Sequence, residues 1–316
     1  MRALRATSIL AGFAALTLPL MPLQAMLVRF APHLARRLPH WYHRRVCRLI
    51  GLRLDIDGAV ARGHPVLLIS NHTSWLDIPV LSALAPVSFV AKKEVGTWPG
   101  VSALARLQRT VFVDRERRTA VGRTTNDMAN RLAGGDNIVL FAEGTSSDGN
   151  RVLPFRTSLF AAAKPRLAAQ PAHDPMIRAG QQAGHGDDPG SRNGNFAKTV
   201  VQTVTITYTR LHGVPLNRAD RPLVGWYGDM DLPPHAWKLL KAGPLDARIV
   251  IGAPVPLEDF HDRKSLARHS EDEIRSNLVR TLRGGDRDRA LLITRPNSRP
   301  QPVKPPTGRA STGRMV

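Results

Sequence analysis

Two kinds of side chain are scarce in this sequence. Its 316 residues include one cysteine, Cys47, and aromatic residues make up only 5% of the chain. A single cysteine excludes an internal disulfide framework and a cysteine-rich zinc site, and it is typical of a reducing compartment. Aromatic rings are absent from the basic C-terminal tail, which argues against nucleic-acid binding by base stacking there.

Acidic residues are absent from both ends of the chain. Residues 1–50 contain eight Arg, residues 295–316 contain four Arg and one Lys, and neither range contains Asp or Glu. Residues 51–294 therefore hold only +7 of the net charge of +20. This excess favours an anionic partner, such as a membrane surface, a nucleic acid or an acidic substrate. We expect a membrane anchor with a basic amphipathic segment at 1–50, a folded domain at 51–294 and a disordered basic tail at 295–316.

Several catalytic signatures are missing as well. The sequence has no Gly-x-Ser-x-Gly elbow, which a serine hydrolase needs, and no Gly-rich loop that ends in Gly-Lys-Ser or Gly-Lys-Thr, which a nucleotide-binding enzyme needs. Most of the 11 His are scattered, and His173 and His185 lie in a stretch without periodicity. No metal site is indicated, because metal ligands cluster at defined spacings.

The longest uncharged stretch lies close to the N-terminus. Ala6–Val28 spans 23 residues without a charge, which is long enough to cross a bilayer. A secretory signal is the alternative, but Leu23–Ala25 does not make a small-x-small cleavage site. Pro19 and Pro22 would kink a spanning helix, so a re-entrant or interfacial hairpin also stays open. The positive-inside rule places the residues after position 29 in the cytoplasm.

A second N-terminal segment, Leu34–Ile50, interleaves basic and apolar residues. This pattern predicts an amphipathic helix that lies on anionic lipid. A solvated helix with one buried stripe would show the same pattern. The basic residues of the segment are Arg36, Arg37, Arg44, Arg45 and Arg48.

Short apolar runs mark the strands of the folded domain. Such runs, ended by polar residues, are typical of buried strands. They lie at Pro65–Ser70, Thr110–Asp114 and Asn137–Ala142. Two later runs also predict strands: Val200–Tyr208, where Thr alternates with Val and Ile, and Ala247–Ile251. A helical pattern at Thr119–Leu132 separates the second and third runs. The alternation predicts an α/β fold with a mixed, partly parallel sheet of five or more strands, flanked by helices. Residues 165–198 lack periodicity and predict a flexible insertion.

A histidine and an aspartate follow the first predicted strand. Ligands bind at the carboxyl ends of strands in open α/β sheets, and His72 and Asp77 are placed there. Five residues along a continuous helix would point them about 140° apart, so a turn must intervene if they are to meet. Asp77 could then orient one ring nitrogen while the other takes a proton from a hydroxyl. A structural His-Asp pair is the alternative.

Two more strand ends deliver polar residues to the same edge. Arg115 follows the second strand, where a guanidinium can bind a phosphate or a carboxylate, or pair with a neighbouring acid. The third strand leads into Glu143, Gly144, Thr145 and Ser146. Small residues there let backbone N–H groups approach an anion, while the Glu143 carboxylate accepts from hydroxyls or Arg; an ordinary turn is the alternative.

The order of these motifs is recognisable. Asn-His-x-Ser-Trp-x-Asp, Lys-Glu with Trp-Pro-Gly, Val-Phe-Val-Asp-Arg and Phe-x-Glu-Gly-Thr follow one another between Leu52 and Phe160. This series resembles the lysophospholipid acyltransferases, the 1-acylglycerol-3-phosphate acyltransferase family. The resemblance implies a glycerolipid acyltransferase-like fold, His72 as general base with Asp77 as its orienting partner, and a headgroup site at Arg115 and Glu143 to Thr145. It also implies an acyl carrier protein or coenzyme A thioester as donor.

The resemblance further implies a reaction without a resident cofactor. His72 would deprotonate the acceptor hydroxyl, the oxygen would attack the thioester carbonyl, and a thiolate would leave with no covalent enzyme intermediate. Attachment to a bacterial inner membrane, with the catalytic domain facing the cytoplasm, would give access to a lysolipid acceptor. A non-catalytic membrane-binding protein is the alternative from another class, but it leaves the three strand ends unexplained.

One position departs from the family pattern. Relatives that act on lysophosphatidic acid usually have Arg after Glu-Gly-Thr, whereas this chain has Ser146. The stretch after Glu143, together with Tyr208–Gly213 and Trp226–Met230, is similar to the bacterial branch that acylates lyso-ornithine lipid. An amino-acid headgroup without phosphate would suit the missing Arg. Lysophosphatidic acid stays open as the acceptor because other Arg residues could hold a phosphate.

Overall fold

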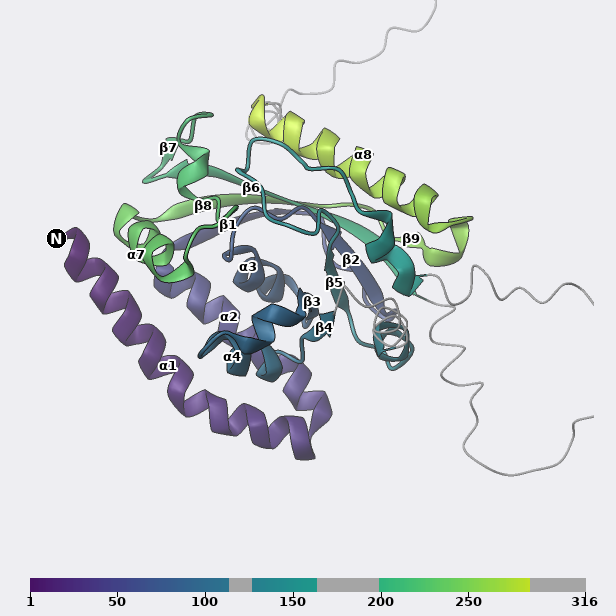
Figure 1. The fold of residues 1–316 in the computed structure, drawn as a ribbon, viewed down its shortest axis with the longest axis horizontal. Coiled ribbons are helices and arrows are strands. Elements are labelled where there is room, and N and C mark those ends of the chain that lie inside the picture. Colours follow the sequence, from purple (N-terminus) through teal and green to yellow (C-terminus); the bar gives the residue numbers. More distant parts are fainter. Residues whose placement is uncertain (114–126, 164–198, 285–316) are drawn as a thin grey trace, which may run out of the picture.

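A computed structural model describes residues 1–113, 127–163 and 199–284 of the protein (Figure 1). The predicted insertion at 165–198, the basic tail at 295–316 and Arg115 lie outside the described residues. Of the helix predicted at Thr119–Leu132, only the end is described, where residues 127–133 are helical.

The core of the described chain is a nine-stranded mixed sheet. Its order is β1-β8-β6-β2-β5-β3-β4, with β7 and β9 paired to β6. Neighbouring strands from β6 to β4 run parallel, whereas β8 pairs antiparallel with β6 and parallel with β1. The strands are β1 (Leu52–Asp57), β2 (Val66–Ser70), β3 (Ser88–Lys92), β4 (Val111–Val113), β5 (Ile138–Phe141), β6 (Val200–Leu211), β7 (Val214–Pro215), β8 (Leu245–Ile251) and β9 (Val255–Pro256). The predicted fold class is confirmed.

Strand β2 shows how the sequence builds both faces of the sheet. Successive side chains of a strand point to opposite faces, so a strand covered on both sides is apolar throughout. Leu67 and Ile69 pack into the core on one face, and Val66 and Leu68 pack into the core on the other. All residues of β2 are buried. This strand therefore holds the residues that follow it on a rigid support.

Helices cover both faces. Figure 1 shows α8 (Arg263–Leu282) along one face, where Leu266, Ile274 and Leu278 reach the core. Its start is fixed by a capping box between Asp262 and Ser265. The opposite face carries α1 (Arg2–Phe30), α2 (Pro32–Ile50), α3 (Asp77–Leu84), α4 (Val101–Leu107) and α7 (Leu232–Ala242). The carboxyl ends of β2 and β5 open on this second side.

Helices α1 and α2 form a hairpin against the domain. The segment predicted as an amphipathic helix at Leu34–Ile50 is helical as part of α2. Helix α1 contains both Pro19 and Pro22 within one helical segment, and Figure 1 shows it bending in its C-terminal half. It is long and apolar enough to cross a membrane. Its N-terminal half, however, packs Ala6 and Ile9 against Leu240 of α7.

Candidate active site

The histidine and the aspartate that follow β2 are in contact. Nδ1 of His72 lies 2.8 Å from Oδ2 of Asp77. A turn at Trp75 and Leu76 intervenes, and Asp77 is the first residue of α3. This is the turn that the five-residue spacing required. The arrangement leaves Nε2 as the ring nitrogen available to a substrate hydroxyl.

The Asp77 carboxylate is fully buried and accepts three more hydrogen bonds. Oδ2 also accepts from the backbone N–H groups of Thr73 (2.7 Å) and Ser74 (2.9 Å), and Oδ1 accepts from the Tyr208 hydroxyl at 2.7 Å. Burial and the Asp77 charge raise the pKa of Tyr208 well above its ordinary value, so this hydroxyl keeps its proton. The carboxylate is thereby held in one orientation toward the His72 ring.

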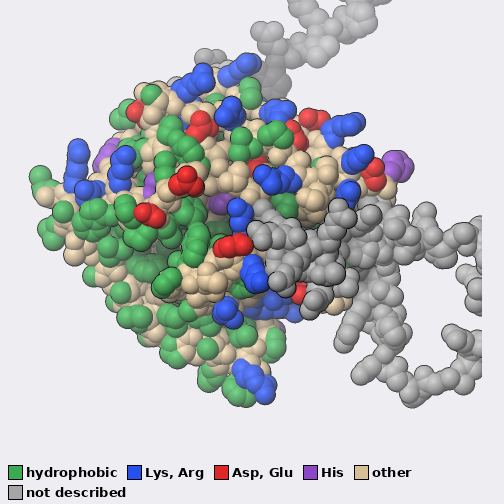
Figure 2. Space-filling view, in the orientation of Figure 1, with side chains coloured by type: hydrophobic (Ala, Val, Ile, Leu, Met, Phe, Trp, Pro, Cys, Tyr) green, Lys and Arg blue, Asp and Glu red, His purple; other side chains and the backbone are tan. Residues whose placement is uncertain are grey.

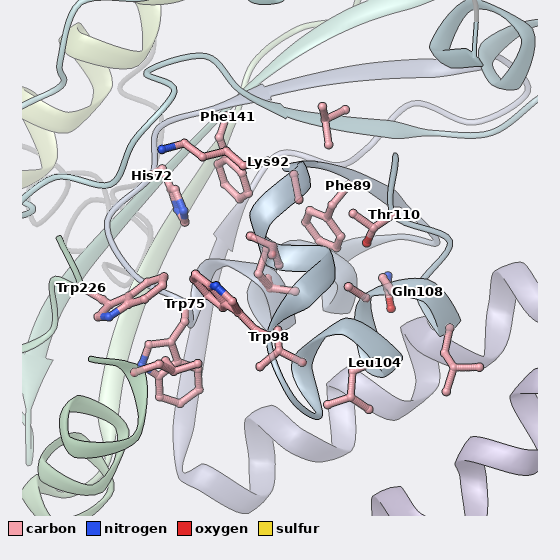
Figure 3. A pocket seen from close by; sticks show the side chains of 18 of the residues that line it. His72, Trp75, Phe89, Lys92, Trp98, Leu104, Gln108, Thr110, Phe141 and Trp226 are labelled. Atoms are coloured by element: carbon pink, nitrogen blue, oxygen red, sulfur yellow. The ribbon is translucent and has the colours of Figure 1, made fainter. Parts of the chain in front are cut away.

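The His72 ring lies at the edge of a cavity. It stacks on Phe141 with ring centroids 4.0 Å apart, and its side chain is 18% exposed. Figure 3 shows the ring beside Phe141 and Lys92, with Trp75, Trp98 and Trp226 nearby. The ring is thus fixed on one face by packing and at Nδ1 by Asp77, while its other edge remains accessible.

The Glu143 carboxylate supports the loop that carries His72. Oε1 accepts from the His72 backbone N–H at 2.8 Å, and Oε2 accepts from the Leu153 N–H at 2.9 Å. The side chain is buried and is not among those that line the cavity. Both oxygens are therefore turned toward backbone rather than toward a headgroup, which differs from the headgroup role that the resemblance implies. The placement makes Glu143 a positioning residue for His72.

Burial raises the pKa of Glu143 to about 8, and the charges of Asp77 and Glu271 add to the rise; its two backbone hydrogen bonds oppose it. The folded protein then keeps a proton that the unfolded chain releases above about pH 4.5. We therefore expect stability to fall as pH rises from about 4.5 to about 8. Glu143→Gln should remove this dependence. Melting temperatures in detergent at several pH values would test it, with the exposed Glu258→Gln as control; parallel curves for wild type and Glu143→Gln would contradict it.

The Gly144–Ser146 loop connects three segments. Gly144 has a φ of +73°, a conformation that favours glycine, and it turns the chain sharply after β5. The Ser147 backbone N–H donates to the His72 carbonyl at 2.8 Å. The Ser146 hydroxyl donates to the Trp226 carbonyl, and the Trp226 backbone N–H donates to the Thr73 carbonyl at 2.9 Å. Ser146 therefore docks a distant segment onto the histidine loop.

The cavity beside His72 is large and mostly apolar. Its volume is about 720 Å³, and Gly144, Thr145 and Ser146 line its mouth together with His72. Figure 3 shows it extending away from His72, past Phe89, to Gln108 and Thr110 on the far side. The charged Lys, Arg, Asp and Glu side chains that line it, among the described residues, are Lys92, Glu94 and Asp229.

Helix α1 supplies part of the wall. Thr17, Leu20, Met21 and Gln24 line the cavity, and their spacing puts them on one stripe of the helix. Gln24 fixes this stripe, because its amide donates to the carbonyls of Ala35 and Leu107, each at 2.9 Å. The sequence offered no signal for this contribution, since it depends on how α1 docks. The described residues contain no group of three or more His, Cys, Asp or Glu placed to hold a metal ion.

Comparisons with known proteins agree on one family. The acyltransferase family model matches residues 53–171. The chain is 45% identical over 276 residues to the lyso-ornithine lipid O-acyltransferase of Brucella abortus, covering 87% of this chain and 94% of that protein. It is 39% identical to the lyso-ornithine lipid O-acyltransferase of Rhizobium meliloti, covering 87% of this chain and 86% of the relative.

A solved structure has the same fold. The crystal structure of the 1-acyl-sn-glycerophosphate acyltransferase of Thermotoga maritima matches with a TM-score of 0.57 at 18% identity. The match covers 89% of this chain and 98% of that one. At this level of identity the likeness establishes the fold of the chain.

Proposed function

Because this chain belongs to the lysophospholipid acyltransferase family, we propose that it moves a fatty acyl group from an acyl carrier protein or coenzyme A thioester to the hydroxyl of lyso-ornithine lipid. The family makes the protein an acyltransferase with a lipid acceptor and an acyl donor. The observation that supports the proposed acyl transfer is His72, oriented by buried Asp77, at the mouth of a long apolar cavity.

In the proposed reaction, Nε2 of His72 takes the proton of the acceptor hydroxyl as its oxygen attacks the thioester carbonyl. A carbon–oxygen bond forms, the carbon–sulfur bond breaks, and the thiolate recovers the proton from His72. Asp77 stabilises the imidazolium that exists between these steps. The acyl chain suits the apolar cavity, whose walls come from α1, α2 and α4. The reaction needs no resident cofactor.

Two observations support lyso-ornithine lipid as the acceptor. The relatives that match most of the chain at 45% and 39% identity carry that name. In addition, the cavity lining includes one Lys and two carboxylates among the described residues, a balance that suits an amino-acid headgroup better than a phosphate dianion.

Lysophosphatidic acid is the second candidate acceptor. The Thermotoga maritima protein that shares the fold is named for it. Lys92 lines the cavity near His72, so a phosphate could find one cation there (Figure 3). Arg115, implied by the resemblance as a headgroup ligand, lies outside the described residues.

Acyl transfer with each acceptor separately would test the proposal. Detergent-solubilised protein is offered radiolabelled acyl carrier protein and acyl coenzyme A thioesters, with lyso-ornithine lipid or lysophosphatidic acid. We expect transfer to lyso-ornithine lipid. Transfer to lysophosphatidic acid alone would replace this acceptor, and transfer to neither by folded protein would overturn both.

We further propose that α1 lies on the cytoplasmic face of the inner membrane rather than across it. Both ends of the helix are docked: the Arg5 guanidinium donates to the carbonyls of Leu240 and Ile50, and Gln24 holds α2 and α4. A spanning helix would have to release these contacts. Helix α1 also exposes large apolar residues, among them Leu10, Leu18, Leu23 and Met26. Figure 2 shows apolar side chains gathered over the part of the molecule where Figure 1 draws α1.

We expect the double substitution Leu10→Glu and Leu18→Glu to weaken membrane binding at least about tenfold, because each buried Leu contributes about 1.5–3 kcal/mol. Flotation with vesicles containing phosphatidylglycerol measures the bound fraction. Acyl transfer to detergent-dispersed acceptor should persist, since neither side chain lines the cavity.

The matched control is Val214→Glu, which adds an acid at an exposed apolar residue of β7. It should float like the wild type. Equal loss of vesicle binding in the double variant and in Val214→Glu would contradict the proposal that α1 lies on the membrane surface.

A further inference from the structure

The segment from Trp226 to Met230 forms a tight turn at the mouth of the cavity. The Trp226 indole N–H donates to the Met230 carbonyl at 2.7 Å and closes the turn. Gly228 has a φ of +65°, which a side chain would disfavour. Trp226 also packs edge-on against Trp98, with ring centroids 5.8 Å apart. The turn is thus closed within itself and held from the opposite wall.

The loops that carry His72 and Ser146 hold this turn in place. The Trp226 backbone N–H donates to the carbonyl of Thr73, next to His72, and the Ser146 hydroxyl donates to the Trp226 carbonyl. A group presented by the turn therefore keeps a defined position relative to the reacting hydroxyl. Asp229 is the charged residue of this turn that lines the cavity.

Asp229 differs from the other carboxylate of the lining. Glu94 follows Lys92 and Lys93 directly in the chain, so its charge is offset locally. Residues 226–234 contain two acids and no base, and within the described chain no hydrogen bond or ion pair joins the Asp229 side chain to another residue. Asp229 is an exposed carboxylate at the mouth of a mostly apolar cavity, where a cationic ligand group would find a partner.

We propose that Asp229 binds the ammonium group of the acceptor headgroup and selects amine-bearing lysolipids, with Ser146 positioning its turn. The proposal rests on the proposed function, because an ornithine headgroup linked through one amine keeps a carboxylate and a second, protonated amine. Lys92 lines the same cavity and supplies a charge of the opposite sign. Recognition of this kind lowers KM for the right headgroup without contributing to the chemical step.

The test compares lyso-ornithine lipid with the same lipid acetylated on its free amine. With wild-type protein, we expect capping to raise KM about tenfold, the size of one partly exposed charge-assisted contact. Asp229→Asn should raise KM for the uncapped lipid by a similar factor and leave kcat within about twofold. The capped lipid should lose nothing further. Ser146→Ala should raise KM for the uncapped lipid by a smaller factor than Asp229→Asn does and should leave KM for the capped lipid unchanged.

The matched control is Asp259→Asn, which removes an exposed carboxylate that does not line the cavity. It corrects for the change in net charge and should match the wild type. Equal KM increases for capped and uncapped lipid in Asp229→Asn would mean that the residue only shapes the turn, and no increase would mean that it makes no contact. Either result overturns the proposal while lyso-ornithine lipid remains the acceptor. If wild-type protein acylates no lyso-ornithine lipid, the proposed acceptor fails as well.

Discussion

Replacing His72 with alanine is expected to lower kcat for acyl transfer about 10³- to 10⁴-fold, the upper part of the range for a lost general base. The reason is that the other histidine lining the cavity among the described residues, His43, is a weak base, because burial lowers its pKa to about 4. Initial rates with saturating acyl thioester and acceptor measure the effect.

The variant should remain folded. Asp77 keeps its three other donors, and the lost stacking on Phe141 costs about 1 kcal/mol. Circular dichroism and flotation on vesicles should match the wild type. His64→Ala, in an exposed loop between β1 and β2, is the matched control and should keep full activity. Transfer at more than about a tenth of the wild-type rate in His72→Ala would remove His72 from the chemistry.

Mass spectrometry of the same two proteins, wild type and His72→Ala, separates general-base from covalent catalysis. Wild-type protein mixed with the acyl donor alone, quenched and weighed by mass spectrometry should carry no acyl group. A stoichiometric adduct lost in His72→Ala would mean that the ring attacks the thioester itself. A protein that only binds membranes would show no transfer in either form.

The fold was predictable where the hydrophobic pattern is strong. β2 and β5 are apolar runs bounded by polar residues, β6 alternates Thr with Val and Ile, and each was predicted within a few residues. β1 was not predicted, although Leu52, Leu54 and Ile56 alternate with charged residues in the way an edge strand does. β3 was missed because Ser88–Lys92 shows neither a long apolar run nor a strict alternation of apolar and polar residues. Its place between β5 and β4 is a product of the whole sheet.

The site was predictable in its local part only. The His72–Asp77 contact spans five residues and depends on one turn; the spacing made the contact conditional on that turn, and the family resemblance implied it. The contact of Ser146 with Trp226 spans 80 residues, and that of Tyr208 with Asp77 spans 131. Contacts at such separations depend on strand order and helix docking, which residue patterns do not encode locally. The α1 stripe that lines the cavity belongs to the same class.

Asp77→Asn is expected to lower kcat about 10²- to 10³-fold with little change in KM, since the substitution removes the charge that stabilises protonated His72. An asparagine fits the site in one orientation. Its oxygen would occupy the Oδ2 position and accept from His72, Thr73 and Ser74, and its NH₂ would donate to the Tyr208 hydroxyl oxygen. The reverse orientation would oppose the NH₂ to two backbone N–H groups, so the ring keeps its tautomer and loses mainly the charge.

Asp136→Asn provides the matched control. Asp136 is also a buried carboxylate, but it pairs with Arg36 at 2.8 Å and Arg109 at 2.7 Å and does not line the cavity. This control should lower the melting temperature and leave kcat of the folded protein near the wild-type value. Tyr208→Phe leaves Oδ1 of Asp77 without its donor, costs about 1–3 kcal/mol of stability and should lower kcat less than tenfold. If Asp77→Asn and Asp136→Asn differ only in stability and share the wild-type kcat, Asp77 serves the fold alone; a loss of kcat confined to Asp77→Asn means that its charge acts through His72 on the reacting hydroxyl.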